Sequence, residues 1–330
     1  MINYTKNIKK NKKSFKKRLG FFLLVFVILF FGAIFLKAGN TFSLVSDNSF
    51  WNTKEEKDNY NEKDRIDILI LGIRGEEDEE YGGTLTDSIM ILSIKTDLKK
   101  SALISLPRDL YAKIPKHGGL REKINYAYAF GENKGINGID LSRQVVESIT
   151  GINIDYAVVI DFKTFENLID AVGGITISLE EDFVEKSQWG WEFRVPKGDN
   201  LLDGKTALYY ARSRFSTNDF DRSRRQQEII LALKDKILSM GVLANPVKIN
   251  EIFNSIGKGV KTNIDLSTGI KLIKYSKYME GDNMEKKILD TTENGLLQQG
   301  KINGIYVLYP KAGLDNFTDI KNDIRGIFEE

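Results

Sequence analysis

The arginines of this chain are unevenly placed. Only 13 of its 48 basic residues are arginine, yet five of them fall within fourteen residues: Arg212, Arg214, Arg222, Arg224 and Arg225. A guanidinium group binds phosphate or carboxylate through two parallel hydrogen bonds, which a lysine ammonium does not offer. The cluster therefore favours a binding site for a polyanion over the alternative, a solvated surface with local pairs to Asp219 and Asp221.

The spacing within this cluster predicts how the side chains point. Arg212 and Arg214 are expected to alternate along an extended segment, so that both face the same side. Arg222, Arg225 and Gln226 come at the start of a predicted helix, where free N–H groups and the helix dipole favour anions. We expect these five residues to contribute to one phosphate-binding site.

A second candidate lies in the motif SLPRD at 105–109. A predicted strand ends at Pro107, and Arg108 and Asp109 follow at its carboxyl end, where binding sites commonly form. The alternative is a structural ion pair that fixes the loop.

The motif TLTDS at 84–88 places Asp87 directly before another predicted strand. This acid is either a turn residue or a ligand for Mg²⁺, which prefers oxygen ligands. Other metal chemistry is restricted by composition. The chain has no cysteine and a single histidine, His117, which excludes disulfides, thiolate sites and zinc sites with several histidines.

The N-terminal charges predict the compartment. Residues 1–18 form a basic tail without acids, and residues 19–36 are uncharged and long enough to cross a bilayer as a helix. Because Lys37 follows instead of a small-residue cleavage site, an uncleaved anchor is favoured over a signal peptide. The expected topology is a single-pass protein of the cell membrane with a cytoplasmic N-terminus.

Residues 37–64 are polar and read as an extracytoplasmic stalk, and 65–330 as one folded domain. Acids outnumber cations outside the tail, so a nucleic-acid partner is not expected. Short apolar runs predict strands at 66–72, 88–94, 101–107, 156–162, 286–290 and 304–310. Periodic patterns predict helices at 163–172, 222–238, 266–279 and 315–329. This mixture predicts an α/β (α+β mixed) fold.

Several motifs together resemble one known family. They are LILG (69–72), LTDSIMILSI (85–94), ISLPRD (104–109), KINYAYAFG (123–131), YAVVIDFKTFENLIDAVGGITI (156–177), LDGKTALYYARSRF (202–215) and DFDRSRRQQ (219–227). In this order they resemble the LytR-CpsA-Psr (LCP) proteins over residues 65–330. The resemblance implies a twisted central sheet flanked by helices, with a hydrophobic tunnel for a polyprenyl lipid and an arginine-lined mouth for its pyrophosphate. It also implies transfer of a glycopolymer from that lipid carrier to a peptidoglycan sugar hydroxyl, assisted by Mg²⁺.

The resemblance also assigns roles to residues. The implied pyrophosphate ligands are Arg108, Arg212, Arg214 and Arg222, completed by Arg225 and Gln226. Asp87 would ligate magnesium, and either Asp109 or Asp219 would accept the proton of the attacking hydroxyl. The sequence departs from the family at two places. Ile73 and Arg74 stand where a second metal-binding Asp is usual in the family, so Arg74 is a candidate to replace part of the metal's charge. Leu85 stands where the family has Arg.

Three functions remain open from sequence. The implied partners of a transferase are a polyprenyl-pyrophosphate-linked glycopolymer, peptidoglycan and the membrane. The same site with water as acceptor would make a lipid-diphosphate hydrolase, and a site without turnover would make a binder of anionic envelope lipid or polymer. The apolar stretches 162–172 and 228–238 are equally suited to a lipid tunnel and to an ordinary core.

Overall fold

The computed structural model describes residues 64–75, 83–240, 259–265, 268, 272 and 275–329. The predicted basic tail, the membrane segment and the stalk up to residue 63 lie outside this set, as does half of the predicted helix 266–279. Among the helices that are described, none combines the length and the apolar character needed to cross a bilayer.

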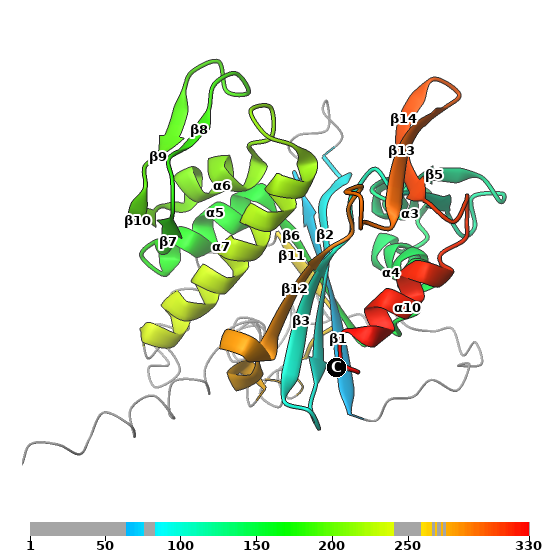
Figure 1. Cartoon of the computed structure of the whole chain (residues 1–330), viewed down its shortest axis with the longest axis horizontal. Coiled ribbons are helices and arrows are strands. Elements are labelled where there is room, and N and C mark those ends of the chain that lie inside the picture. The colour runs from blue at the N-terminus through cyan, green and yellow to red at the C-terminus, as the bar shows by residue number, and fades with distance from the viewer. Residues whose placement is uncertain are drawn as a thin grey trace, which may run out of the picture.

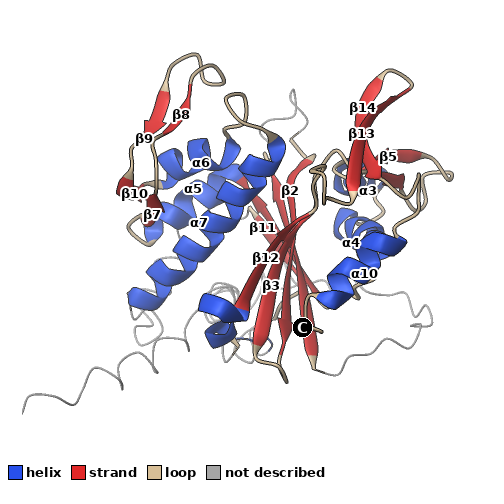
Figure 2. Ribbon diagram, in the orientation of Figure 1, coloured by secondary structure: helices blue, strands red, loops and turns tan. Residues whose placement is uncertain are grey.

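A mixed six-stranded sheet forms the centre of the domain, in the order β11-β6-β1-β2-β3-β12 (Figures 1 and 2). Its strands are β1 (Arg65–Ile73), β2 (Thr86–Lys95), β3 (Lys100–Ser105), β6 (Tyr156–Asp161), β11 (Val260–Thr262) and β12 (Met284–Ile288). β1 pairs antiparallel with β2 and parallel with β6, and β3 pairs antiparallel with β2. The ends of β1, β3 and β6 and the start of β2 consequently meet at one edge.

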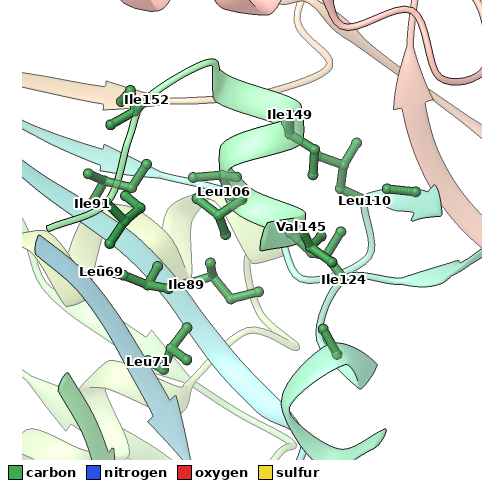
Figure 3. Packing of buried hydrophobic residues seen from close by; sticks show 14 of the residues in the cluster. Leu69, Leu71, Ile89, Ile91, Leu106, Leu110, Ile124, Val145, Ile149 and Ile152 are labelled. Atoms are coloured by element: carbon green, nitrogen blue, oxygen red, sulfur yellow. The ribbon is translucent and has the colours of Figure 1, made fainter. Parts of the chain in front are cut away.

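The two faces of this sheet carry separate hydrophobic cores, because successive side chains of a strand point to opposite faces. Ile68 belongs to the core under the helices α5 (Phe162–Ala171), α6 (Gly204–Arg212) and α7 (Asp219–Ser239). Leu69 belongs to the core under α3 (Tyr126–Lys134), α4 (Gly138–Thr150) and α10 (Thr318–Gly326), where Figure 3 shows it near Ile89 and Ile91 of β2. The predicted α/β fold with helices on both sides of a sheet is confirmed.

Two hairpins project beyond the edge of the sheet where β1 and β3 end (Figure 1). One consists of β8 (Phe183–Glu185) and β9 (Phe193–Val195), and the other of β13 (Leu297–Ile302) and β14 (Ile305–Pro310). The remaining short elements are β4 (Tyr111–Lys113), β5 (Arg121–Lys123), β7 (Ile175–Leu179), β10 (Gly198–Leu202) and the 3₁₀ turns η5 (Ser276–Tyr278) and η6 (Gly281–Asn283).

Side-chain caps explain where the helices of the first core begin. Asp161, Asp203 and Asn218 precede α5, α6 and α7, and each accepts a backbone N–H of the first turn. α7 therefore starts at Asp219, three residues before the predicted start. The helices α3, α4 and α6 were not predicted, and the closing helix is shorter than the predicted 315–329.

Candidate functional site

The edge where β1, β2 and β3 meet brings together residues that are distant in sequence. β1 ends at Ile73 and presents Arg74, while the antiparallel neighbour β2 starts at Thr86 and presents Asp87. β3 ends at Ser105, and the turn after it presents Arg108. The sheet register thus places two arginines and one acid side by side, among them the two residues Asp87 and Arg108 that the sequence motifs singled out separately.

The carboxylate of Asp87 lies between two guanidinium groups. Its Oδ2 accepts a hydrogen bond from Arg74 Nε at 3.2 Å, and its Oδ1 accepts one from Arg108 Nη1. Both oxygens therefore already face a cation. The described residues also contain no group of three or more acidic, histidine or cysteine side chains arranged to hold a metal. By themselves, the protein side chains described here do not form a metal site.

Asp219 is the second acid that contacts several arginines. Its Oδ1 lies 3.1 Å from Arg222 Nη1 and 3.2 Å from Arg214 Nη1, and its Oδ2 lies 3.5 Å from Arg108 Nε. Burial raises the pKa of this carboxyl, but the combined field of the three arginines outweighs burial and leaves the pKa below its ordinary value. Asp219 is therefore an ionised side chain that orients arginines.

Arg222 is the most deeply buried of these cations. Its side chain is 6% exposed, and Nη2 donates to the backbone oxygen of Asp87 at 3.2 Å. Burial lowers its pKa to about 10, so the group still carries its charge at neutral pH. Among the described residues, no hydrogen-bond acceptor pairs with the buried Nε atoms of Arg222 and Arg108. Asp219 Oδ2 lies 3.5 Å from Arg108 Nε, which is an ion-pair contact and not a hydrogen bond. Buried donors without an acceptor are rare in folded proteins, and an anionic ligand is one partner that satisfies such donors.

Charge counting supports the same conclusion. The four arginines Arg74, Arg108, Arg214 and Arg222 pair with Asp87 and Asp219, and Arg108 Nε also lies 4.0 Å from Oδ2 of Asp109. Lys123 and Asp109 form a further pair beside it, with Nζ and Oδ1 2.6 Å apart. The arginine cluster therefore keeps an excess of positive charge, which suits a ligand with two negative charges.

Arg212 lies differently from its sequence neighbours. It is the last residue of α6, so the predicted extended segment from Arg212 to Arg214 is wrong: the helix turns the two side chains apart. The Arg212 guanidinium lies 4.4 Å from the ring centre of Phe162 and 5.2 Å from that of Trp189. The two aromatic rings hold this cation in a fixed position.

An apolar cavity of about 140 Å³ begins beside Arg212. Its walls come from α5, α6, α7 and the facing strands, and Arg212, Gln226, Gly72 and Ser88 contribute to its lining. Ser88 directly follows Asp87, and its buried Oγ has no partner among the described residues. The cavity therefore lies next to the arginine cluster, and its polar end carries an unsatisfied hydroxyl.

Arg225 does not reach the cluster. Its guanidinium donates to the backbone oxygens of Tyr210 and Ser213 and lies 4.6 Å from the ring centre of Phe183, which ties α7 to α6. The N-terminus of α7 is also less available than predicted. The N–H groups of Phe220 and Asp221 both donate to the Asn218 side chain, so they are not free for an anion.

Sequence reasoning missed several residues around the site. Lys123 and Tyr306 lie close together, with the Lys123 Nζ 5.8 Å from the Tyr306 ring centre, and Trp189 packs on Arg212. No local pattern distinguishes these three side chains. The one available signal was the position of Lys123 at the start of the KINYAYAFG motif.

Comparisons with known proteins agree with this architecture. A relative from Oceanobacillus iheyensis, named polyisoprenyl-teichoic acid–peptidoglycan teichoic acid transferase TagU, is 35% identical over 271 residues, which cover 77% of this chain and 81% of the relative. The crystal structure of TagV from Bacillus subtilis is similar with a TM-score of 0.62 and 28% identity over 81% of this chain and 98% of TagV. The structure titled "TagT bound to LIIa-WTA" shares the fold with a TM-score of 0.61, at 24% identity, over 81% of this chain and 92% of TagT.

These similarities define the chain as an enzyme of the transferase class. The sequence model of the LytR_cpsA_psr family matches residues 34–323, which is most of the chain. The chain belongs to the LytR-CpsA-Psr family.

Proposed function

We propose that this protein transfers a glycopolymer from a polyprenyl-pyrophosphate carrier to a sugar hydroxyl of peptidoglycan. The observation that carries the proposal is the arginine cluster with excess positive charge, placed next to an apolar cavity. The name of the TagU relative describes a transfer of this kind for that protein. A diphosphate with a long apolar tail matches both parts of the site.

The donor pyrophosphate binds between the arginines in this proposal. The guanidinium groups of Arg108, Arg214 and Arg222 donate to its oxygens. Arg212 holds the phosphate nearest the lipid, and the tail enters the apolar cavity beside it. Because about 140 Å³ is below the range of about 300–1,000 Å³ of ligand pockets, the cavity must widen between α5 and α7 when the lipid enters.

The chemical step is a phosphoryl transfer. The acceptor hydroxyl oxygen attacks the phosphorus that carries the glycan, a new O–P bond forms, and the bridging O–P bond to the second phosphate breaks. Polyprenyl phosphate leaves with the electron pair of that bond. Fixed arginines stabilise the charge that spreads over the transferred and leaving oxygens.

The hydroxyl proton goes to a carboxylate oxygen of Asp109 in this proposal. Asp219 is the less suitable base, because three arginines lower its pKa and so weaken its affinity for a proton. Asp109 has one close cation, Lys123 at 2.6 Å, and a more distant one, Arg108 at 4.0 Å, and it lines the cavity on the side of α3.

Magnesium is a separate part of the proposal. Asp87 would supply one ligand, and phosphate oxygens and water would supply the others, since Mg²⁺ often uses only one or two carboxylates. The ion would add positive charge on the phosphates when bound. Because Arg74 and Arg108 occupy both Asp87 oxygens, one of them has to move aside.

The membrane assignment also remains a proposal. It depends on the apolar residues 19–36 and the basic residues 1–18, which predict a single-pass protein with the catalytic domain outside the cell. A domain in that place shares its membrane with the lipid donor and faces peptidoglycan directly.

One assay separates the three functions that remained open from sequence. The full chain in detergent is incubated with labelled polyprenyl-pyrophosphate glycan, Mg²⁺ and peptidoglycan. Label attached covalently to peptidoglycan supports transfer, whereas free phosphorylated glycan alone supports hydrolysis. Lipid binding without either product supports a binder and contradicts the proposal. Arg212→Ala is expected to lose most of the transfer, and Arg194→Ala on the β8–β9 hairpin, which does not line the apolar cavity, serves as the control.

A further inference from the structure

A second cavity lies on the other side of Arg108. This polar cavity has a volume of about 360 Å³, and four charged side chains line it, Arg108, Asp109, Glu122 and Lys123, together with Tyr111 and Ile305. It shares no lining residue with the apolar cavity beside Arg212. The two cavities also belong to opposite faces of the sheet, since Ile70 and Met90 line the first, whereas Tyr126 of α3 lines the second.

The β13–β14 hairpin forms one wall of this polar cavity. The Leu308 N–H donates to the backbone oxygen of Asp109 at 2.9 Å, and Leu308 forms a parallel bridge with Leu110. These bonds attach the hairpin directly to the segment that carries Asp109. Ile305 lines the cavity, and Tyr306 is 43% exposed next to it.

Tyr306 lies close to the charged residues of the site. Its ring centre is 5.8 Å from Lys123 Nζ, and Lys123 in turn contacts Asp109 at 2.6 Å. Partial burial, followed by the negative charges of Asp109 and Asp219, raises the pKa of its hydroxyl. The hydroxyl therefore stays protonated and can donate, while the exposed ring offers an apolar face.

These groups match the chemistry of a sugar. Carboxylates such as Asp109 and Glu122 accept hydrogen bonds from hydroxyls, and Lys123 and the tyrosine hydroxyls donate. The ring of Tyr306 provides a flat apolar surface for the C–H face of a pyranose, with a polar group at its tip. The volume lies at the lower end of the range of about 300–1,000 Å³ for small-molecule sites.

The geometry of phosphoryl transfer indicates whether this cavity binds the sugar of the donor or that of the acceptor. The attacking and leaving oxygens lie roughly in line on opposite sides of the phosphorus. The leaving polyprenyl phosphate lies toward Arg212 and the apolar cavity. The acceptor must then approach from the opposite side, where Arg108 and Asp109 line the polar cavity.

We infer that the polar cavity, with the exposed ring of Tyr306 at its rim, is the subsite for the acceptor glycan. The inference rests on the proposed transfer and adds to it where the acceptor binds. In this subsite Tyr306 is a positioning residue that holds the acceptor sugar, Lys123 keeps Asp109 in place, and Asp109 receives the proton of the attacking hydroxyl.

The test compares Tyr306→Ala, Tyr306→Phe and Glu122→Gln with the wild type, using the full chain in detergent. The control is Trp191→Ala, which removes a 49% exposed ring from the β8–β9 hairpin at the same end of the molecule. Three quantities are measured: the KM for peptidoglycan acceptor in transfer, the thermal shift on adding polyprenyl-pyrophosphate glycan, and the affinity for soluble lipid-free peptidoglycan glycan strands.

We expect Tyr306→Ala to raise the acceptor KM about tenfold, because a lost binding contact raises KM while kcat is retained. Glu122→Gln and Tyr306→Phe, which each change one hydrogen-bonding group and keep the ring of Tyr306, are expected to raise it less, and Trp191→Ala is expected to leave it near the wild-type value. The donor-induced thermal shift is expected to stay unchanged in all four variants.

Two results would overturn the inference. One is an unchanged acceptor KM in both Tyr306→Ala and Glu122→Gln. The other is an equal loss of the donor-induced thermal shift in these variants, which would place the donor's glycan in the cavity instead. If the wild type shows no transfer, the proposed function fails, and the affinity for lipid-free glycan strands alone then tests the subsite. Glycan strands that bind the wild type but not Tyr306→Ala support the subsite. Equal binding to both proteins, or no binding to the wild type, refutes it.

Discussion

The two faces of the central sheet end in cavities of opposite chemistry. On the side of α5, α6 and α7 the cavity is apolar, and its charged end is Arg212 held between two aromatic rings. On the side of α3 and the β13–β14 hairpin the cavity is polar and contains Asp109, Glu122 and Lys123. Arg108, Asp87 and Arg222 lie between them. In the proposed transfer, one end of the sheet serves two unlike substrates, because each face of the sheet is built independently.

The strongest way to break this arrangement is to remove the arginine between the two cavities. Arg108→Ala removes the guanidinium that contacts both Asp87 and Asp219. We expect transfer to fall about 10²–10³-fold, as for the loss of one fixed donor to a transition-state oxygen. The measurement is initial transfer rate with saturating donor and acceptor.

The matched control for this prediction is Arg143→Ala on α4. Arg143 pairs with Asp140 and Glu147 and lines neither cavity. A rate within threefold of wild type for Arg108→Ala, with both variants folded by circular dichroism, would contradict the site.

The apolar side can be altered alone by filling its cavity. Ile230 lines it from α7, so Ile230→Trp is expected to raise the KM for lipid donor about tenfold while the acceptor KM stays constant. The measurement is a donor titration at fixed acceptor. Ser239→Trp, at the exposed end of the same helix, controls for the added ring. A changed acceptor KM in Ile230→Trp alone would show that the two cavities are not separate.

Removing magnesium tests how far the arginines between the two cavities replace the charge of the metal ion. Since Arg74 already faces Asp87, we expect chelation with EDTA to lower transfer only about three- to tenfold, less than the roughly 10²-fold typical of a lost fixed charge. Arg74→Asp restores a second acid and is expected to make the rate depend more steeply on added Mg²⁺. An equal dependence in both proteins would show that Arg74 does not substitute for metal charge.

The smallest expected effect is on stability against pH. The folded-state pKa of Asp219 is depressed below 3.8, so its stabilising contribution is present above that value and is lost as pH falls through the folded pKa. Between pH 5 and pH 3 the free energy of unfolding by urea is expected to fall more steeply for the wild type than for Asp219→Asn. Equal slopes would show that Asp219 is not held ionised by the arginines.

The sheet and its main helices were predictable because their patterns are strong. The apolar β-branched runs of β1, β2, β3 and β6 and the periodic face of α7 were placed within a few residues. The helix α3 was missed because nearly every residue of YAYAF is buried, so no polar face marks its period. For α6 a signal existed, since Asp203 followed three residues later by Thr206 forms a helix cap.

The site was predicted in part for a similar reason. Residue types indicated Arg108, Arg222 and Asp87, and the strand register places them together. Arg225 lies one helical turn after Arg222, yet its guanidinium donates to the backbone oxygens of Tyr210 and Ser213 instead. Tyr306 could not be found, because its nearness to Asp109 depends on the bridge between Leu308 and Leu110.

The direction of β1 has a consequence for an enzyme tethered at its N-terminus. The chain enters the sheet at Arg65, and the nine residues of β1 carry it about 30 Å to the edge with Arg74. If residues 19–36 cross the bilayer as the sequence predicts, the tether and the lipid head reach the domain at opposite ends of this strand. The domain then lies flat against the bilayer or inverts on residues 37–64, whose extended reach of about 90 Å allows both.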